Sequence, residues 1–178
     1  MGQRLSLRAS RSRATLSEET GPCQGLCKSS WRYSGLIGGV NDDHGRDISL
    51  DAEGFAYIAG NTFSDQTTFP VVAGPPITYT GNGDGFVAKV DPIGYGLVYC
   101  GYFGGTQTDQ AADISPDTFG NAYIVGWTNS SQTQSFPVVG GPDLTRNGTG
   151  TSDAFVVKIA AYLDSILSAH GADVQVLD

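Results

Sequence analysis

Short runs of β-branched and aromatic residues alternate with turn residues along most of the chain. Each run is bounded by Gly, Asp or Pro, which is typical of strands. Asp51-Ala-Glu-Gly54 and Asp91-Pro-Ile-Gly94 each offer Asp for the first turn position and Gly for a positive φ, so both are predicted hairpin turns. The pattern predicts strands at 46–50, 55–60, 85–90, 97–103, 112–115, 121–126 and 153–159.

The chain also repeats itself, mainly at an offset of 66 residues, with insertions between the matched runs where loops are expected. Four antiparallel strands per repeat are typical of a β-propeller blade. The predicted fold class is therefore all-β, with two blade repeats of an incomplete propeller. The matched pairs are Ile37–Asp43 with Phe103–Asp109, Asp47–Asp51 with Asp113–Asp117, Gly54–Gly60 with Gly120–Gly126, Phe69–Val72 with Phe136–Val139, and Asp84–Val90 with Asp153–Ile159.

Both ends of the repeated region fall within a blade. Tyr33–Ile37 matches Leu97–Phe103 and is predicted as a strand that belongs to a preceding blade. In the stretch 160–169 apolar residues recur at helical spacing, which predicts a short C-terminal helix. The predicted parts are a disordered basic leader at 1–30, two blades at 31–159 (about 38–103 and 104–159), and a divergent tail at 160–178.

These repeats resemble the SBBP family, the seven-bladed β-propeller repeat of large bacterial secreted and cell-surface proteins. The shared motifs are a Tyr-containing strand ending in Gly-Gly, an Asp-Ile-Ser-x-Asp to Gly-x-Ala-Tyr-Ile-x-Gly hairpin, a Phe-Pro loop and an Asp-x-Phe-Val-x-Lys strand. The resemblance covers about residues 31–159. It implies an extracellular or cell-surface location and carries over no catalytic residues.

The chain departs from that family in holding two units, whereas propellers typically have four to eight blades. An unclosed pair of blades leaves sheet faces and edges bare. We therefore expect the chain to be a fragment of a larger protein, or to need self-association or further blades to close the fold.

Charge restricts the partners. The formal net charge is -8, and because residues 1–32 carry +4, the remainder carries -12. So acidic a region repels phosphate backbones and anionic lipid headgroups, which argues against nucleic acid and membrane surfaces. No run of about 18 apolar residues is present, so membrane insertion is not expected. The charge does not argue against a protein or glycan ligand.

Repeated aspartates are the candidate metal ligands. Even spacing along a continuous strand places carboxylates on one face, where they could converge on a hard cation such as Ca²⁺. Against this, turns and Asx hydrogen bonds already account for several of them, and the Asp-x-Asp-x-Asp-Gly spacing is missing. No cofactor is therefore expected beyond this calcium candidate. Its residues are Asp43, Asp47, Asp51, Asp109, Asp113 and Asp117.

The long loops Asn61–Gly83 and Trp127–Ser152 are where a rigid scaffold would carry ligand contacts. Their aromatic candidates are Phe69, Tyr79 and Trp127. Phe69 recurs as Phe136 beside the same Val-Val pair, so the favoured interpretation of this position is a plug that packs between blades.

Repeated framework residues without a singular catalytic cluster predict a non-catalytic module, structural or protein- or glycan-binding. Only two His are present, and His44 becomes Gln110 in the second repeat. The alternative is part of a hydrolase or lyase propeller whose site is completed by other blades.

Overall fold

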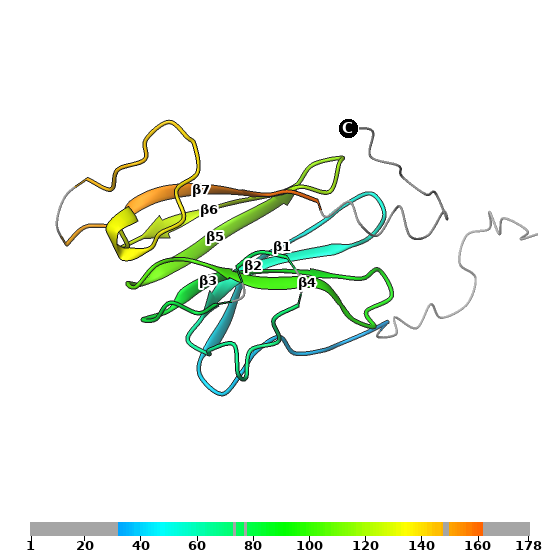
Figure 1. Cartoon of the computed structure of the whole chain (residues 1–178). Coiled ribbons are helices and arrows are strands. Elements are labelled where there is room, and N and C mark those ends of the chain that lie inside the picture. The colour runs from blue at the N-terminus through cyan, green and yellow to red at the C-terminus, as the bar shows by residue number, and fades with distance from the viewer. Residues whose placement is uncertain (1–31, 73, 77, 148–149, 162–178) are drawn as a thin grey trace, which may run out of the picture. The chain divides into compact units, whose positions relative to one another are not determined.

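The computed structural model describes residues 32–72, 74–76, 78–147 and 150–161. These residues form two antiparallel sheets, one of four strands and one of three (Figure 1). Apart from one short 3-10 turn at Gln132–Gln134, the described secondary structure is β. The strands are β1 Asp43–Leu50, β2 Ala56–Thr62, β3 Asp84–Val90, β4 Leu97–Phe103, β5 Asp109–Pro116, β6 Ala122–Thr128 and β7 Asp153–Ile159.

Each sheet is a simple meander, in the order β1-β2-β3-β4 and β5-β6-β7. The two sheets repeat one another in detail. The register between β1 and β2 shifts between Gly45 and Asp47, and the register between β5 and β6 shifts at the equivalent place, between Ala111 and Asp113. The all-β fold predicted from the sequence is confirmed, and every predicted strand from 46 to 159 has its counterpart.

The hairpin turns form as their residues require. In the first sheet Gly54 has φ 87° and donates its N–H to the carbonyl of Asp51, and Gly120 does the same toward Asp117 with φ 80° in the second. A side chain disfavours this left-handed conformation, so Gly holds both positions. The Asp side chain accepts further backbone N–H groups of its turn, which fixes the loop.

The structure differs from the sequence prediction at the start of the repeated region. The strand predicted at Tyr33–Ile37 is wrong: these residues take no strand pairing in the structure. A strand requires a neighbour to satisfy its backbone groups, and no described strand pairs with this segment. The predicted helix in the tail lies outside the described residues, except for Ala160 and Ala161, which are not helical.

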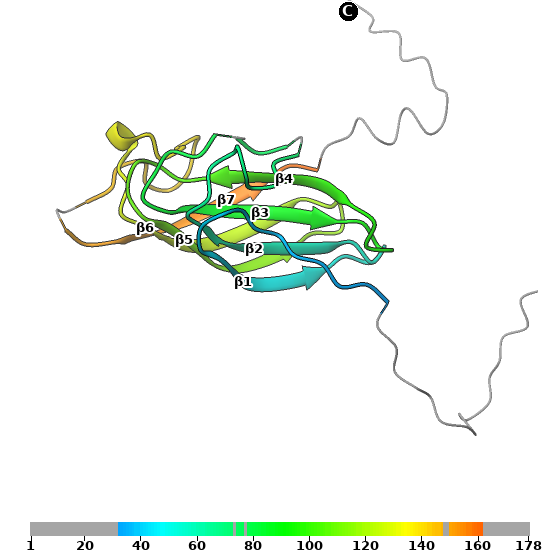
Figure 2. The ribbon, with the colours of Figure 1, turned by 90° about the horizontal axis from the view of Figure 1, so that it is seen from below.

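The main hydrophobic core lies between the two sheets, where β5 runs beside β1 and β2 (Figures 1 and 2). From the first sheet it takes Tyr57, Val87 and Phe103. A second cluster around Phe69, Phe86 and Tyr102 covers the opposite face of the first sheet. The second sheet adds Ala111, Ile114, Ala122, Ile124 and Phe155 to the main core.

Candidate functional site

The contact between the two sheets is built from two different faces. The first sheet contributes the face that carries Tyr57 and Val87, and the second contributes the face that carries Ile114 and Ile124. All four side chains are at most 3% exposed. We call this contact the blade junction. The junction uses one face of each sheet and leaves the other face of each sheet outside it. Because the sheets are repeats, the outer face of each sheet is the counterpart of the face that the other sheet contributes to the junction.

Two of the hydrogen bonds that cross the blade junction are those of Asp47 and Tyr57. The carboxylate of Asp47 accepts the backbone N–H of Ile114 at 3.0 Å. The hydroxyl of Tyr57 lies 3.1 Å from the carbonyl of Gly120, in the hairpin turn of the next sheet, and 3.1 Å from the carboxylate of Asp51, and its one proton is shared between these two acceptors. Both bonds use residues of the repeated framework, so the same groups exist once more in the second sheet.

The ammonium group of Lys89 contacts the Tyr57 hydroxyl. Lys89 donates to it at 2.6 Å and lies 3.6 Å from the carboxylate of Asp51. The ammonium also lies over the ring of Phe55, 4.1 Å from its centroid. Burial and the neighbouring Asp51 carboxylate raise the pKa of Tyr57, so the phenol stays protonated. The sequence analysis singled out Asp51 but missed Lys89, although the Lys recurs as Lys158.

The equivalent face of the second sheet is exposed. Tyr123, Val125 and Val156 occupy the positions of Tyr57, Ala59 and Val87, and they are 39%, 46% and 65% exposed where their counterparts are 0% exposed. Lys158 still lies over the ring of Tyr123, 5.0 Å from its centroid. We call the surface of Tyr123, Val125 and Val156 the second open face.

The unused face of the first sheet is partly exposed as well. Ile48 and Leu50 are 60% and 63% exposed, whereas Ile114, the repeat of Ile48, is buried in the blade junction. Ile48 pairs with Ile58, which packs on the cluster around Phe69. We call the surface of Ile48, Leu50 and Ile58 the first open face.

A carboxylate fastens the start of each repeat, and in the second repeat it is buried. Asp109 is 0% exposed, and it accepts the backbone N–H of Gly105 at 2.7 Å, the hydroxyl of Ser130 at 2.9 Å and that of Thr128. Asp43 repeats this arrangement with Gly39, Thr62 and Ser64. The sequence analysis missed the hydroxyl partners. The sequence does carry a signal for these hydroxyls, because Thr62-x-Ser64 recurs as Thr128-x-Ser130.

Asp84 lies beside Asp109 at the blade junction. It is 0% exposed; one carboxylate oxygen accepts the N–H and hydroxyl of Thr80, and the other has no hydrogen-bond partner. A Cβ placed on Gly104 would come within 3.2 Å of both carboxylates, so only glycine fits between them. Burial, with a contribution from the charge of Asp109, raises the pKa of Asp84 to about 7.

This raised pKa predicts that the protein loses stability as pH rises. Above pH 3.8 the unfolded Asp84 gives up its proton, whereas the folded carboxyl keeps it up to about pH 7, so the stabilisation present at low pH is lost across that interval. Asp84→Asn has no proton to lose. We expect thermal melts to show the variant gaining a few degrees over wild type at pH 8 and less at pH 5. An equal gain at both pH values would contradict the assignment, and Asp153→Asn, at the repeat position, is the matched control.

The six calcium candidates do not lie together as one group, although Asp47 and Asp113 interact with each other. Asp43 and Asp109 begin the repeats, Asp51 and Asp117 hold hairpin turns, and Asp47 bridges the blade junction, where Asp113 is exposed. Hydrogen bonding to Ile114 lowers the pKa of Asp47, and interaction with Asp47 raises that of Asp113. Among the described residues, no three His, Cys, Asp or Glu side chains lie together as a metal site. Calcium binding stays a prediction of the sequence.

The three aromatic loop candidates are also separated. Phe69 is 3% exposed and packs on Phe86 and Tyr102 in a hydrophobic cluster. Phe136 packs on Phe155 in the main core, as the plug interpretation predicts. Tyr79 lies against Tyr102, and its hydroxyl accepts the N–H of Gly83.

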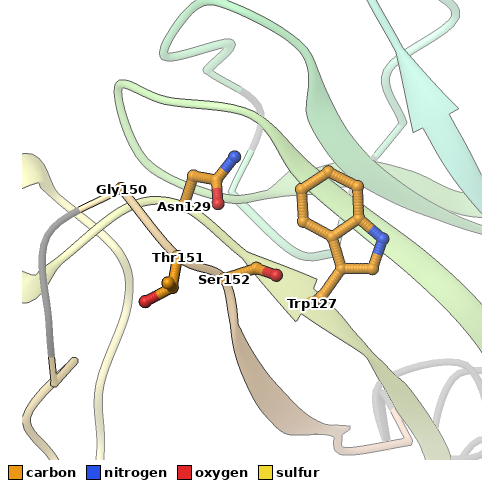
Figure 3. A pocket seen from close by; sticks show the side chains of 5 residues that line it. All are labelled: Trp127, Asn129, Gly150, Thr151 and Ser152. Atoms are coloured by element: carbon orange, nitrogen blue, oxygen red, sulfur yellow. The ribbon is translucent and has the colours of Figure 1, made fainter.

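Trp127 lines a pocket. The pocket has a volume of about 500 Å³ and lies between the end of β6 and the segment before β7 (Figure 3). Besides the indole it is lined by Asn129, Gly150, Thr151 and Ser152. An aromatic ring beside an amide and two hydroxyls offers stacking and hydrogen bonding to a small polar ligand.

Repeated antiparallel meanders that pack face to face at a blade junction are typical of β-propeller blades. Comparison with protein families agrees: residues 99–131 match the model of SBBP, described as a beta-propeller repeat. The matched segment runs from β4 through β5 to the end of β6 and so spans the connection between the two blades. No curated protein matches the chain. No helix within the described residues is long and apolar enough to cross a membrane.

Proposed function

We propose that this chain is a non-catalytic scaffold module of a larger propeller, and that its second open face binds a further β-sheet blade. The module is a structural repeat, and the framework residues that recur in both sheets serve turns, the core and the blade junction. By its resemblance to secreted and cell-surface repeats, it works outside the cytoplasm, where the assembled propeller offers its loops to a protein or glycan. The pocket at Trp127 supports such a ligand role.

The observation that carries the proposal is the contrast between equivalent residues. Tyr57 and Val87 are 0% exposed because the second sheet covers them, whereas Tyr123 and Val156 are 39% and 65% exposed. Burying apolar surface is favourable by roughly 25 cal/mol per Å². A sheet face that matches a buried face in sequence and is itself exposed is suited to the same partner, another blade.

An added blade tests this proposal. We would insert a second copy of residues 91–159 directly after Ile159, which supplies a fourth strand to the second sheet and three strands of a third. The free energy of unfolding is expected to rise by about 3 kcal/mol or more, because Tyr123, Val125 and Val156 become buried. Chemical denaturation measures it.

The control is the same insertion with Val125→Asp and Val156→Asp in the original repeat, which should cancel the gain. If the insertion leaves the stability unchanged, the second open face does not bind a blade and the proposed function is wrong.

A further inference from the structure

The blade junction is asymmetric, and the chain exposes both of the faces that compose it. The first sheet gives the junction its Tyr57 face, and the second sheet repeats that face as the second open face. The second sheet gives the junction its Ile114 face, and the first sheet repeats that one as the first open face. The two open faces are thus counterparts of the two halves of a contact that already exists within the chain.

We propose that a second copy of this chain docks head to tail, placing its first open face on the second open face of its neighbour. The inference rests on the proposed function and names the partner of the same face. The contact between copies repeats the internal blade junction, with each residue replaced by its counterpart about 66 residues away in the sequence.

The offset assigns the hydrogen bonds of the docked pair. Asp113 takes the place of Asp47, and its carboxylate, exposed on β5, accepts the backbone N–H of Ile48 in the second copy. Within the chain the corresponding bond, from Ile114 to Asp47, is 3.0 Å long. Likewise the hydroxyl of Tyr123 donates to the carbonyl of Gly54 in the second copy, as that of Tyr57 donates to Gly120.

An unfilled strand position points to the same partner. Among the described strands β3 is paired on both edges, with β2 and β4, but its repeat β7 is paired only with β6. Tyr33–Ile37 matches β4 in sequence, takes no strand pairing in the structure, and has Leu36 fully exposed. In the docked pair this segment of the second copy becomes the fourth strand beside β7, and its backbone groups gain the partners that they lack within one chain.

One polar bridge of the internal contact is not repeated in the copy-to-copy contact. Within the chain Arg46 donates to Asn61 at 2.8 Å and to Gln110 of the next sheet at 3.2 Å. The repeat positions are Ala112, Trp127 and, in the second copy, His44. The charged bridge is thus replaced by a short side chain and two rings, which lowers the cost of desolvating this part of the contact.

A contact of this kind uses a different surface on each partner, so it continues until the ring closes. Propellers typically have four to eight blades, which corresponds to about two to four copies of a two-blade chain. We would measure the mass of the full chain by sedimentation velocity, from low to high micromolar concentration. The expected mass at high concentration is about two to four times that of the monomer.

Two single substitutions decide whether the contact is head to tail. Val125→Asp blocks the second open face, and Ile48→Asp blocks the first. Both sites are exposed, so each variant should keep the circular dichroism spectrum of the wild type. If Ile48→Asp does not fold, Leu50→Asp replaces it. Alone, each variant should be a monomer. Mixed, they should form a dimer and nothing larger, because one intact pair of faces remains.

A wild-type chain that is monomeric at every concentration overturns the inference, as do variants that stay associated alone or a mixture that stays monomeric. The inserted third blade separates this failure from that of the proposed function. If the insertion stabilises the chain but copies do not associate, the open face binds a blade that another part of a longer polypeptide supplies.

Discussion

Replacing Asp109 by alanine is expected to cost about 3–5 kcal/mol of unfolding free energy, one of the two largest effects in the molecule. The carboxylate is 0% exposed and accepts hydrogen bonds from Gly105, Thr128 and Ser130. Alanine leaves the Gly105 N–H and the Ser130 hydroxyl without this acceptor, whereas the Thr128 hydroxyl keeps the carbonyl of Ser130. Each buried donor without a partner costs about 1–3 kcal/mol when no compensation occurs. Denaturation in urea at pH 7 measures the loss.

The first repeat provides a matched control for this prediction. Asp43 makes the same three kinds of bond, to Gly39, Thr62 and Ser64, but it lies at the partly exposed start of β1. Water can therefore reach the donors that Asp43→Ala leaves behind, and we expect about 1–2 kcal/mol. Equal losses for the two variants would show that burial at the blade junction does not strengthen the Asp109 network.

The second large effect is expected for Phe155→Ala. Phe155 is 8% exposed, and its ring packs edge-on against Phe103 of the first sheet, with centroids 5.5 Å apart, and against Phe136 at the same distance. Its removal leaves a cavity between the sheets, for which losses of about 3–5 kcal/mol are typical. Thermal and urea unfolding would measure it.

A neighbouring residue on the same strand is the control for Phe155. Val156 points to the second open face and is 65% exposed, so Val156→Ala should change the monomer's stability by less than about 0.5 kcal/mol. The comparison also tests the face assignment of β7. If Val156→Ala proved as costly as Phe155→Ala, the second open face would not be open in the monomer.

The fold was largely predictable because its information is local and repeated. Seven strands, both kinds of hairpin turn and the blade order follow from short apolar runs, from Asp and Gly at turn positions, and from the offset of 66 residues. Tyr33–Ile37 shows the limit of such reasoning. Its sequence matches a strand, but strand formation depends on a neighbour that the pattern does not contain.

The candidate site was predictable only in part. Repetition identified Asp43, Asp47 and Asp109 as framework residues, but it did not separate a turn, a bridge between blades and a buried anchor. It also kept Phe69 among the candidate ligand contacts while favouring a plug between blades, and in the structure this side chain is 3% exposed and packs in a hydrophobic cluster. The roles of Lys89 and of the Thr-x-Ser hydroxyls depend on their hydrogen-bond partners, which the sequence does not show.

By itself, the sequence determined the secondary structure and the repeat, because turn chemistry and alternation act over a few residues and need no distant contact. Only the tertiary structure decided which of two equivalent residues is buried. Tyr57 and Tyr123 stand in identical local sequence, Ala-Tyr-Ile, yet one is 0% and the other 39% exposed. The difference comes from the sheet that covers the first and not the second, and burial of that kind is a property of the assembly of segments in space.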